Sequence, residues 1–190
     1  MVRDSARAAV RVKSWLFAAA GVAYIARGLM DFGDPKFSDA TTPFDFAAVV
    51  GTTIAMILLA AAVALATATG DLTGTAGKLS WIVIAGLALS ATSNLLEDGF
   101  GGASVGFFFG VGGFVTVVGL LVTGVAALLD RRNPRVIATV ILAIGLASFL
   151  PVTLSWLIIG VLCEALAAWS WGVRRETPRW QSSLPGHVMR

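Results

Sequence analysis

Charged residues are scarce in this chain of 190 residues. They make up 13% of the sequence, whereas a typical soluble domain contains about 25%. Hydrophobic residues reach 57%, and the mean hydropathy is +0.84. Because so few polar side chains are left to face water, we expect an integral membrane protein.

Cysteine and histidine are nearly absent. Cys163 is the single cysteine, and His187, the single histidine, lies in the polar C-terminal segment. One cysteine excludes an internal disulfide and a cysteine-ligated zinc or iron–sulfur site. One histidine excludes haem ligation by paired histidines and most histidine-based acid–base chemistry. The GxSxG, HExxH and Walker-type motifs are missing too, so we expect no catalytic residue, no cofactor, no metal site and no enzyme.

Long apolar runs dominate what is present. A spanning helix needs roughly 20 mainly apolar residues. The sequence predicts an all-α fold, a polytopic bundle of six transmembrane helices, at about 14–31, 44–69, 79–97, 104–129, 136–150 and 152–173. The last two belong to one apolar stretch, and Pro151 favours a tight hairpin between them. The six helices form a transmembrane domain, 14–173, between a basic N-terminal segment, 1–13, and a basic tail, 174–190.

The basic residues follow a pattern along this domain. Twelve of the 14 lysine and arginine residues lie before the first helix, after the last, or in the second and fourth loops. These segments all face the same side in a six-helix arrangement, and lysine and arginine are enriched on the cytoplasmic side. The sequence therefore predicts that both termini are cytoplasmic.

Two carboxylates lie beside a glycine-rich segment, NLLEDGFGG, between the third and fourth runs. With Asp31, Glu97 and Asp98 would form an external acidic cluster, whose oxygen atoms suit Ca²⁺ or Mg²⁺. Alternatively, they are only the hydrated end of the third helix, and the following glycines terminate it.

Glu164 lies well inside the last predicted helix, where an ionisable group costs at least about 2.5 kcal/mol. It is a candidate ligand or proton site together with Arg27 and Asn94. It could instead be structural, either protonated and hydrogen-bonded or paired with Arg27. Arg27 also lies one turn before Asp31, which offers a local ion pair. Asn94 could instead bond to a neighbouring helix.

Glycines recur at four-residue spacing in the fourth predicted helix, a pattern that permits close helix packing. The predicted helix-packing face consists of Gly102, Gly106, Gly110 and Gly113. It would serve either packing within the bundle or the seam of a homodimer.

The segments NLLEDGFGG and LLDRRNPR, with the Gly/Phe-rich helix between them, resemble small six-helix bacterial membrane proteins of unassigned function. The last hairpin, ILAIGLASFLPVTLSWLIIGVLCEALAAWS, is similar to the αα repeats of HdeD-like membrane proteins. This second likeness implies a link to acid stress. The earlier helices lack the repeated proline turns of that family, so it assigns no site residue.

These observations support two functional expectations. The first is a non-enzymatic accessory, envelope-stress or assembly factor of the bacterial inner membrane. The second is a small transporter, or a protein that binds a lipid or small molecule, with Glu164 in its site. The expected partners are membrane lipids and a second copy or another membrane protein. Nucleic acid is not expected, because the basic residues border apolar runs and suit anionic headgroups.

Overall fold

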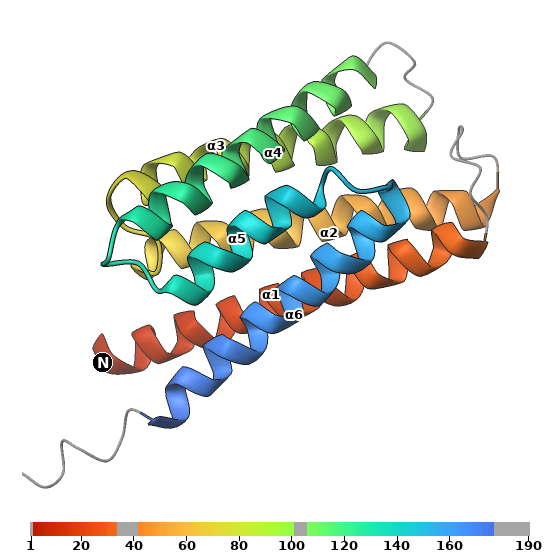
Figure 1. Ribbon diagram of the computed structural model, residues 1–190. Coiled ribbons are helices and arrows are strands. Elements are labelled where there is room, and N and C mark those ends of the chain that lie inside the picture. Colours follow the sequence, from red (N-terminus) through yellow and green to blue (C-terminus); the bar gives the residue numbers. More distant parts are fainter. Residues whose placement is uncertain (1, 34–41, 101–105, 177–190) are drawn as a thin grey trace, which may run out of the picture.

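The computed structural model describes residues 2–33, 42–100 and 106–176, and these residues form six α-helices (Figure 1). The helices are α1 (Val2–Gly33), α2 (Pro43–Ala68), α3 (Gly74–Asn94), α4 (Gly106–Leu129), α5 (Arg135–Ala147) and α6 (Val152–Glu176). A short π-helix, η1 (Leu95–Gly99), continues α3. The predicted all-α bundle is confirmed, whereas Gly102 and the tail after residue 176 lie outside the described residues.

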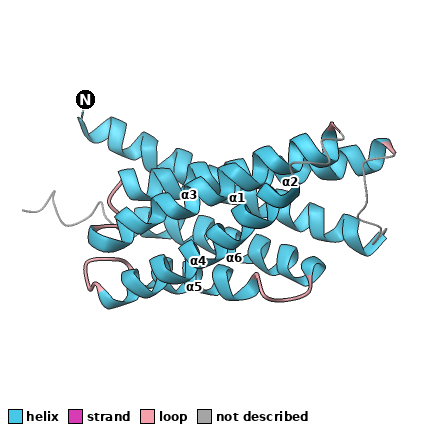
Figure 2. Ribbon diagram, turned by 90° about the horizontal axis from the view of Figure 1, so that it is seen from above, coloured by secondary structure: helices cyan, strands magenta, loops and turns pink. Residues whose placement is uncertain are grey.

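The six helices are arranged as a closed ring. Each helix packs against two neighbours, in the order α1, α2, α3, α4, α5, α6 and back to α1. Viewed along two directions, α1 to α3 form one layer and α4 to α6 the other (Figures 1 and 2). The middle helices of the two layers, α2 and α5, face each other across the centre of the ring.

Five of the helices are long and apolar enough to cross a membrane. These spans are Ala8–Phe32, Pro43–Ala68, Gly74–Gly99, Gly106–Leu129 and Val152–Gly172. Many of their large apolar side chains point outward, such as Trp15, Trp81 and Phe114, which are more than half exposed. An outer surface of this kind suits lipid, and the chain is a multi-pass membrane protein.

Helix α5 is shorter than the sequence suggested. The predicted helix ran from 136 to 150, but α5 ends at Ala147 and has 13 residues. At 1.5 Å per residue it is about 20 Å long, less than a hydrocarbon core of about 30 Å. Residues 148–151 form the hairpin predicted at Pro151, which begins before the proline because the residue ahead of a proline avoids helical geometry. The chain therefore turns back before α5 reaches the length of a full span.

The segments that carry most of the lysine and arginine residues lie together at one end of the bundle. In Figure 1 the start of α1, the α2–α3 turn, the α4–α5 turn and the end of α6 all lie on the left. This is the arrangement that the distribution of lysine and arginine predicted. Helix α1 also begins at Val2 rather than at the predicted residue 14, so the basic residues before 14 belong to the same helix.

Specific local interactions set the ends of α2. Thr42 and Asp45 form a capping box, in which the Asp45 N–H donates to Thr42 Oγ1 (3.2 Å) and the Thr42 N–H donates to Asp45 Oδ2 (2.9 Å). Such caps stabilise a helix by about 1 kcal/mol. After the helix, Gly70 adopts a φ of 80°, the left-handed geometry that glycine accepts most easily. Asp45 thus acts as a helix cap.

Two pairs of helices meet at glycines with almost no space between their backbones. A β-carbon at Gly21 of α1 would lie 2.9 Å from the carbonyl oxygen of Gly160 of α6, and one at Gly160 would lie 2.8 Å from that of Gly21. Gly86 of α3 and Gly112 of α4 make the same reciprocal contact, at 3.0 Å in both directions. These glycines set the close approach of α1 to α6 and of α3 to α4.

Two glycines of the predicted packing face of the fourth helix, Gly110 and Gly113, do not pack against another helix of the described bundle. A β-carbon at Gly110 or Gly113 would have nothing within 4 Å. Close packing uses Gly112 and Gly119 instead, and both glycines face α3. Gly106 lies against the side chain of Glu97 rather than against another backbone. The four-residue spacing therefore did not identify the glycines that pack within the bundle, and the alternative role of this face in a homodimer seam stays a prediction.

Candidate functional site

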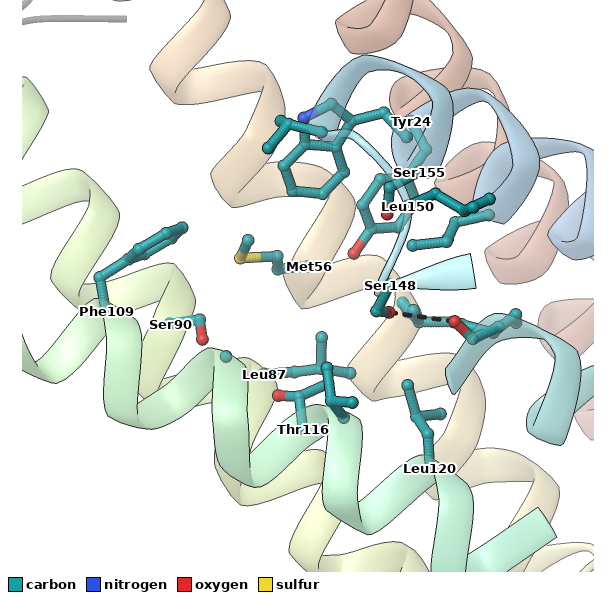
Figure 3. Close-up of a pocket in the computed structure, with 17 residues that line it drawn as sticks. Tyr24, Met56, Leu87, Ser90, Phe109, Thr116, Leu120, Ser148, Leu150 and Ser155 are labelled. Atoms are coloured by element: carbon teal, nitrogen blue, oxygen red, sulfur yellow. Dashed lines mark hydrogen bonds between the residues drawn. The ribbon is translucent and has the colours of Figure 1, made fainter. Parts of the chain in front are cut away.

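A half-open cavity of about 250 Å³ lies between the helices of the ring (Figure 3). It forms where α5 ends early, because α2 then faces the α5–α6 hairpin instead of a full-length helix. Its walls come from α1, α2, α3, α4 and the hairpin. The lining residues include Tyr24, Met56, Leu87, Gly113, Ile144 and Trp156. The cavity is mainly apolar and could hold a small molecule.

Two aromatic rings form one wall of this cavity. Tyr24 of α1 stacks on Trp156 of α6, with ring centroids 5.4 Å apart and planes inclined by 18°. In Figure 3 Tyr24 lies with Ser155 on one side, across Met56 from Ser90 and Thr116. Stacked rings are stiff and apolar, so they give the cavity a defined shape.

Two of the hydroxyl groups that line the cavity are bonded to their own helices. Thr116 Oγ1 donates to the Gly112 carbonyl oxygen (2.8 Å), and Ser148 Oγ donates to that of Ile144 (3.0 Å). Ser90 Oγ is buried without a hydrogen bond within the described residues, and it lies against Gly112. The sequence analysis did not predict this cavity.

Arg27 and Asp31 form a buried ion pair on α1. Arg27 Nη1 donates to Asp31 Oδ1, and Arg27 Nε donates to Thr52 Oγ1 on α2 (2.8 Å). The Asp31 side chain is 0% exposed and that of Arg27 is 10% exposed. Asp98 of η1 also acts electrostatically on Arg27. The local pair that the sequence offered as an alternative for Arg27 is therefore the one formed.

Asn94 bonds across to a neighbouring helix. Its side-chain amide donates to the Val49 carbonyl oxygen and to Thr53 Oγ1 of α2, both at 3.0 Å. The neighbouring Thr52 accepts from Arg27, so one turn of α2 receives polar groups from both α1 and α3. Asn94 therefore has a structural contact at the place where sequence analysis weighed a ligand site.

Glu164 lies apart from both of these residues. A β-carbon at Gly21 would lie 2.7 Å from Glu164 Oε1, so this carboxyl group covers the crossing of α1 and α6. Gly21 precedes Arg27 by six residues, or about 9 Å along the helix. Glu164 Oε1 is buried and has no hydrogen bond within the described part of the chain. Glu164 thus lies apart from Arg27 and Asn94, which both bond to one turn of α2, and none of the three residues lines the cavity.

The external acidic residues are divided between two roles. Asp31 and Asp98 both act on Arg27, whereas Glu97 lies against Gly106 at the start of α4. In residues 2–33, 42–100 and 106–176, no three carboxylate, cysteine or histidine side chains are grouped so that they could hold a metal ion. The segment does contain an unexpected feature, because Glu97 and Asp98 lie in the π-helix η1.

At the opposite end of the bundle, polar contacts tie the turns together. Lys13 of α1, 3% exposed, pairs with Asp71 of the α2–α3 turn. Asn133 Oδ1, from the α4–α5 turn, accepts from the Thr73 N–H (2.7 Å). Such partners lie 58 and 60 residues apart in the sequence, which no local pattern reveals.

Comparison with known proteins adds no further assignment. No family model, curated protein or solved structure matches this chain. The likenesses noted in the sequence, including that to HdeD-like proteins, stay predictions. The fold and the cavity together define the class of protein. It is a multi-pass helical membrane protein with a mainly apolar cavity between the helices of its ring.

Proposed function

We propose that this protein is a non-enzymatic protein of the bacterial inner membrane that binds a small, mainly apolar molecule inside its helix ring. The observation that carries the proposal is the cavity of about 250 Å³. An engineered apolar cavity of about 150 Å³ binds benzene. A cavity of the observed volume and apolar lining can hold a ligand somewhat larger than benzene.

The proposal keeps the expectation of ligand binding from the sequence but places the ligand in a different site. A protein that binds a lipid or small molecule was expected to use Glu164, but the cavity is lined by other residues. An accessory role in the envelope is compatible with such binding, since a bound molecule can act as a signal or as cargo. The basic ends of the helices support a cytoplasmic position for both termini, and bilayer lipid is the proposed route of ligand entry.

Filling the cavity is expected to abolish binding. Gly113 lines the cavity, and a β-carbon there would have nothing within 4 Å, so Gly113→Leu places its side chain in free space. The apolar probe p-cymene should raise the unfolding midpoint of the wild type in detergent, because a ligand that binds only the folded state stabilises it. It should not do so in Gly113→Leu. The measurement is thermal unfolding over a range of p-cymene concentrations.

Gly110→Leu is the matched control. Gly110 lies on the same helix, also has nothing within 4 Å of a β-carbon, and does not line the cavity. Its response to p-cymene should equal that of the wild type, and partition into detergent affects all three proteins alike. If Gly113→Leu gains the same stabilisation as the other two, the probe binds elsewhere and the proposal fails.

A further inference from the structure

Two hydroxyl groups that line the cavity have no hydrogen-bond partner among the described residues. Tyr24 and Ser155 both line the cavity, and they are only 2% and 8% exposed. Within the described residues, neither hydroxyl makes a hydrogen bond, unlike those of Thr116 and Ser148. In Figure 3 Tyr24 of α1 and Ser155 of α6 are drawn on the same side of the cavity.

Unpaired hydroxyl groups are costly in such a place. A buried donor or acceptor without a partner costs about 1–3 kcal/mol, and in a bilayer no bulk water is at hand to satisfy it. Tyr24 is otherwise fixed by its stack on Trp156, the residue after Ser155. Two unpaired hydroxyls that line the same apolar cavity are therefore suited to a polar atom of a bound molecule.

The start of α6 adds to this polarity. Val152, the first residue of α6, also lines the cavity. The Ser155 N–H donates to the Pro151 carbonyl oxygen (2.9 Å), so the hydrogen bonds of the helix begin at Ser155. The N-terminal end of a helix carries partial positive charge. An electron-rich oxygen is therefore favoured beside Ser155 over a cationic group.

The volume of the cavity limits the size of the apolar part of the ligand. If benzene occupies a cavity of about 150 Å³, a cavity of about 250 Å³ holds on the order of ten non-hydrogen atoms at the same density. A stacked aromatic wall and aliphatic residues such as Met56 and Leu87 favour a compact ring or a branched chain.

We infer that the ligand is a small lipophilic molecule carrying one hydroxyl or carbonyl oxygen, and that Tyr24 and Ser155 hydrogen-bond this oxygen. This inference rests on the proposed function and specifies the ligand class of the same cavity. Tyr24 donates to the oxygen, and Ser155 donates to it or accepts from its hydroxyl hydrogen.

Thymol and p-cymene test the inference, because they share one carbon skeleton and differ by a hydroxyl group. The thermal titration yields the dissociation constant of each probe for the wild type, Tyr24→Phe, Ser155→Ala and the double variant. Thymol should bind the wild type about fivefold to tenfold more tightly than p-cymene does, as one or two hydrogen bonds imply. The double variant should lose this preference and keep its affinity for p-cymene.

Comparing the two probes within each protein separates lost hydrogen bonds from lost folding. If the wild type binds both probes equally, or the double variant keeps the preference for thymol, Tyr24 and Ser155 do not recognise an oxygen and the inference fails while the proposed function stands. If neither probe stabilises the wild type more than Gly113→Leu, the proposed function fails with it. If the double variant does not fold, the single variant that does fold, Tyr24→Phe or Ser155→Ala, is compared with the wild type for its preference for thymol.

Discussion

Gly112→Leu is expected to lower the free energy of unfolding by about 3 kcal/mol, because it forces α3 and α4 apart. A β-carbon at Gly112 would lie 2.7 Å from the Ser90 backbone nitrogen and 3.0 Å from the Gly86 carbonyl oxygen. Backbone atoms inside a helix cannot move aside as a flexible side chain can. The free energy would be measured by reversible unfolding in mixed detergent micelles.

Gly110→Leu again supplies the control, because its β-carbon has open space around it. Both substitutions exchange glycine for leucine on α4, so helix propensity changes alike. The difference between the two variants therefore isolates the α3–α4 contact. Equal stabilities would mean that α3 and α4 do not meet at Gly112, which contradicts the packing described above.

Arg27→Met is expected to cost about 3–5 kcal/mol, because it leaves Asp31 without its counterion. The Asp31 side chain is 0% exposed, and its second carboxylate oxygen has no hydrogen bond within the described residues. An uncompensated carboxylate there must either remain charged in an apolar setting or take up a proton. The same unfolding measurement in mixed micelles would detect the loss.

The double variant Arg27→Met/Asp31→Leu should recover most of this stability. Replacing both members of a buried ion pair by apolar residues is often neutral or stabilising, since both desolvation costs are removed. A double-mutant cycle with Asp31→Leu completes the test. If Arg27→Met alone were as stable as the wild type, the pair would be hydrated, and the burial of Asp31 would be contradicted.

Much of the helical frame follows from the sequence alone. The apolar runs located α2 to within a residue and the start of α6 at Val152, because a span needs an uninterrupted apolar stretch. Pro151 gave the position of the last hairpin, since proline restricts both itself and the residue before it. The i,i+4 spacing of Arg27 and Asp31 offered their ion pair in advance, as this contact is local.

The rest depends on contacts between distant segments. Gly110 and Gly112 are equally small, and only the position of α3 decides which of them is packed. Ser14 and Ser170 hydrogen-bond at 2.8 Å although 156 residues separate them. The cavity depends on α5 ending at Ala147 rather than at 150, a difference of less than one helical turn. Periodicity and composition contain none of this information.

The site predicted around Glu164 illustrates the same point. An ionisable residue inside a span usually faces other helices, and Glu164 does lie on Gly21 of α1. Its distance from Arg27 and Asn94 follows from the three-dimensional arrangement of α1, α3 and α6. The cavity, by contrast, is built mostly of residues such as Leu87 and Met56, which look like any others in an apolar helix.

The most direct test of a ligand inside the ring is native mass spectrometry of the protein released from its own membrane. The wild type, Gly110→Leu and Glu164→Gln should each retain the same bound mass, because neither substituted residue lines the cavity. Gly113→Leu should appear without it. A bound mass that persists in Gly113→Leu, or a wild type without any bound mass, would contradict the account. Loss of the mass in Glu164→Gln would contradict it too, and would place the ligand at the crossing of α1 and α6.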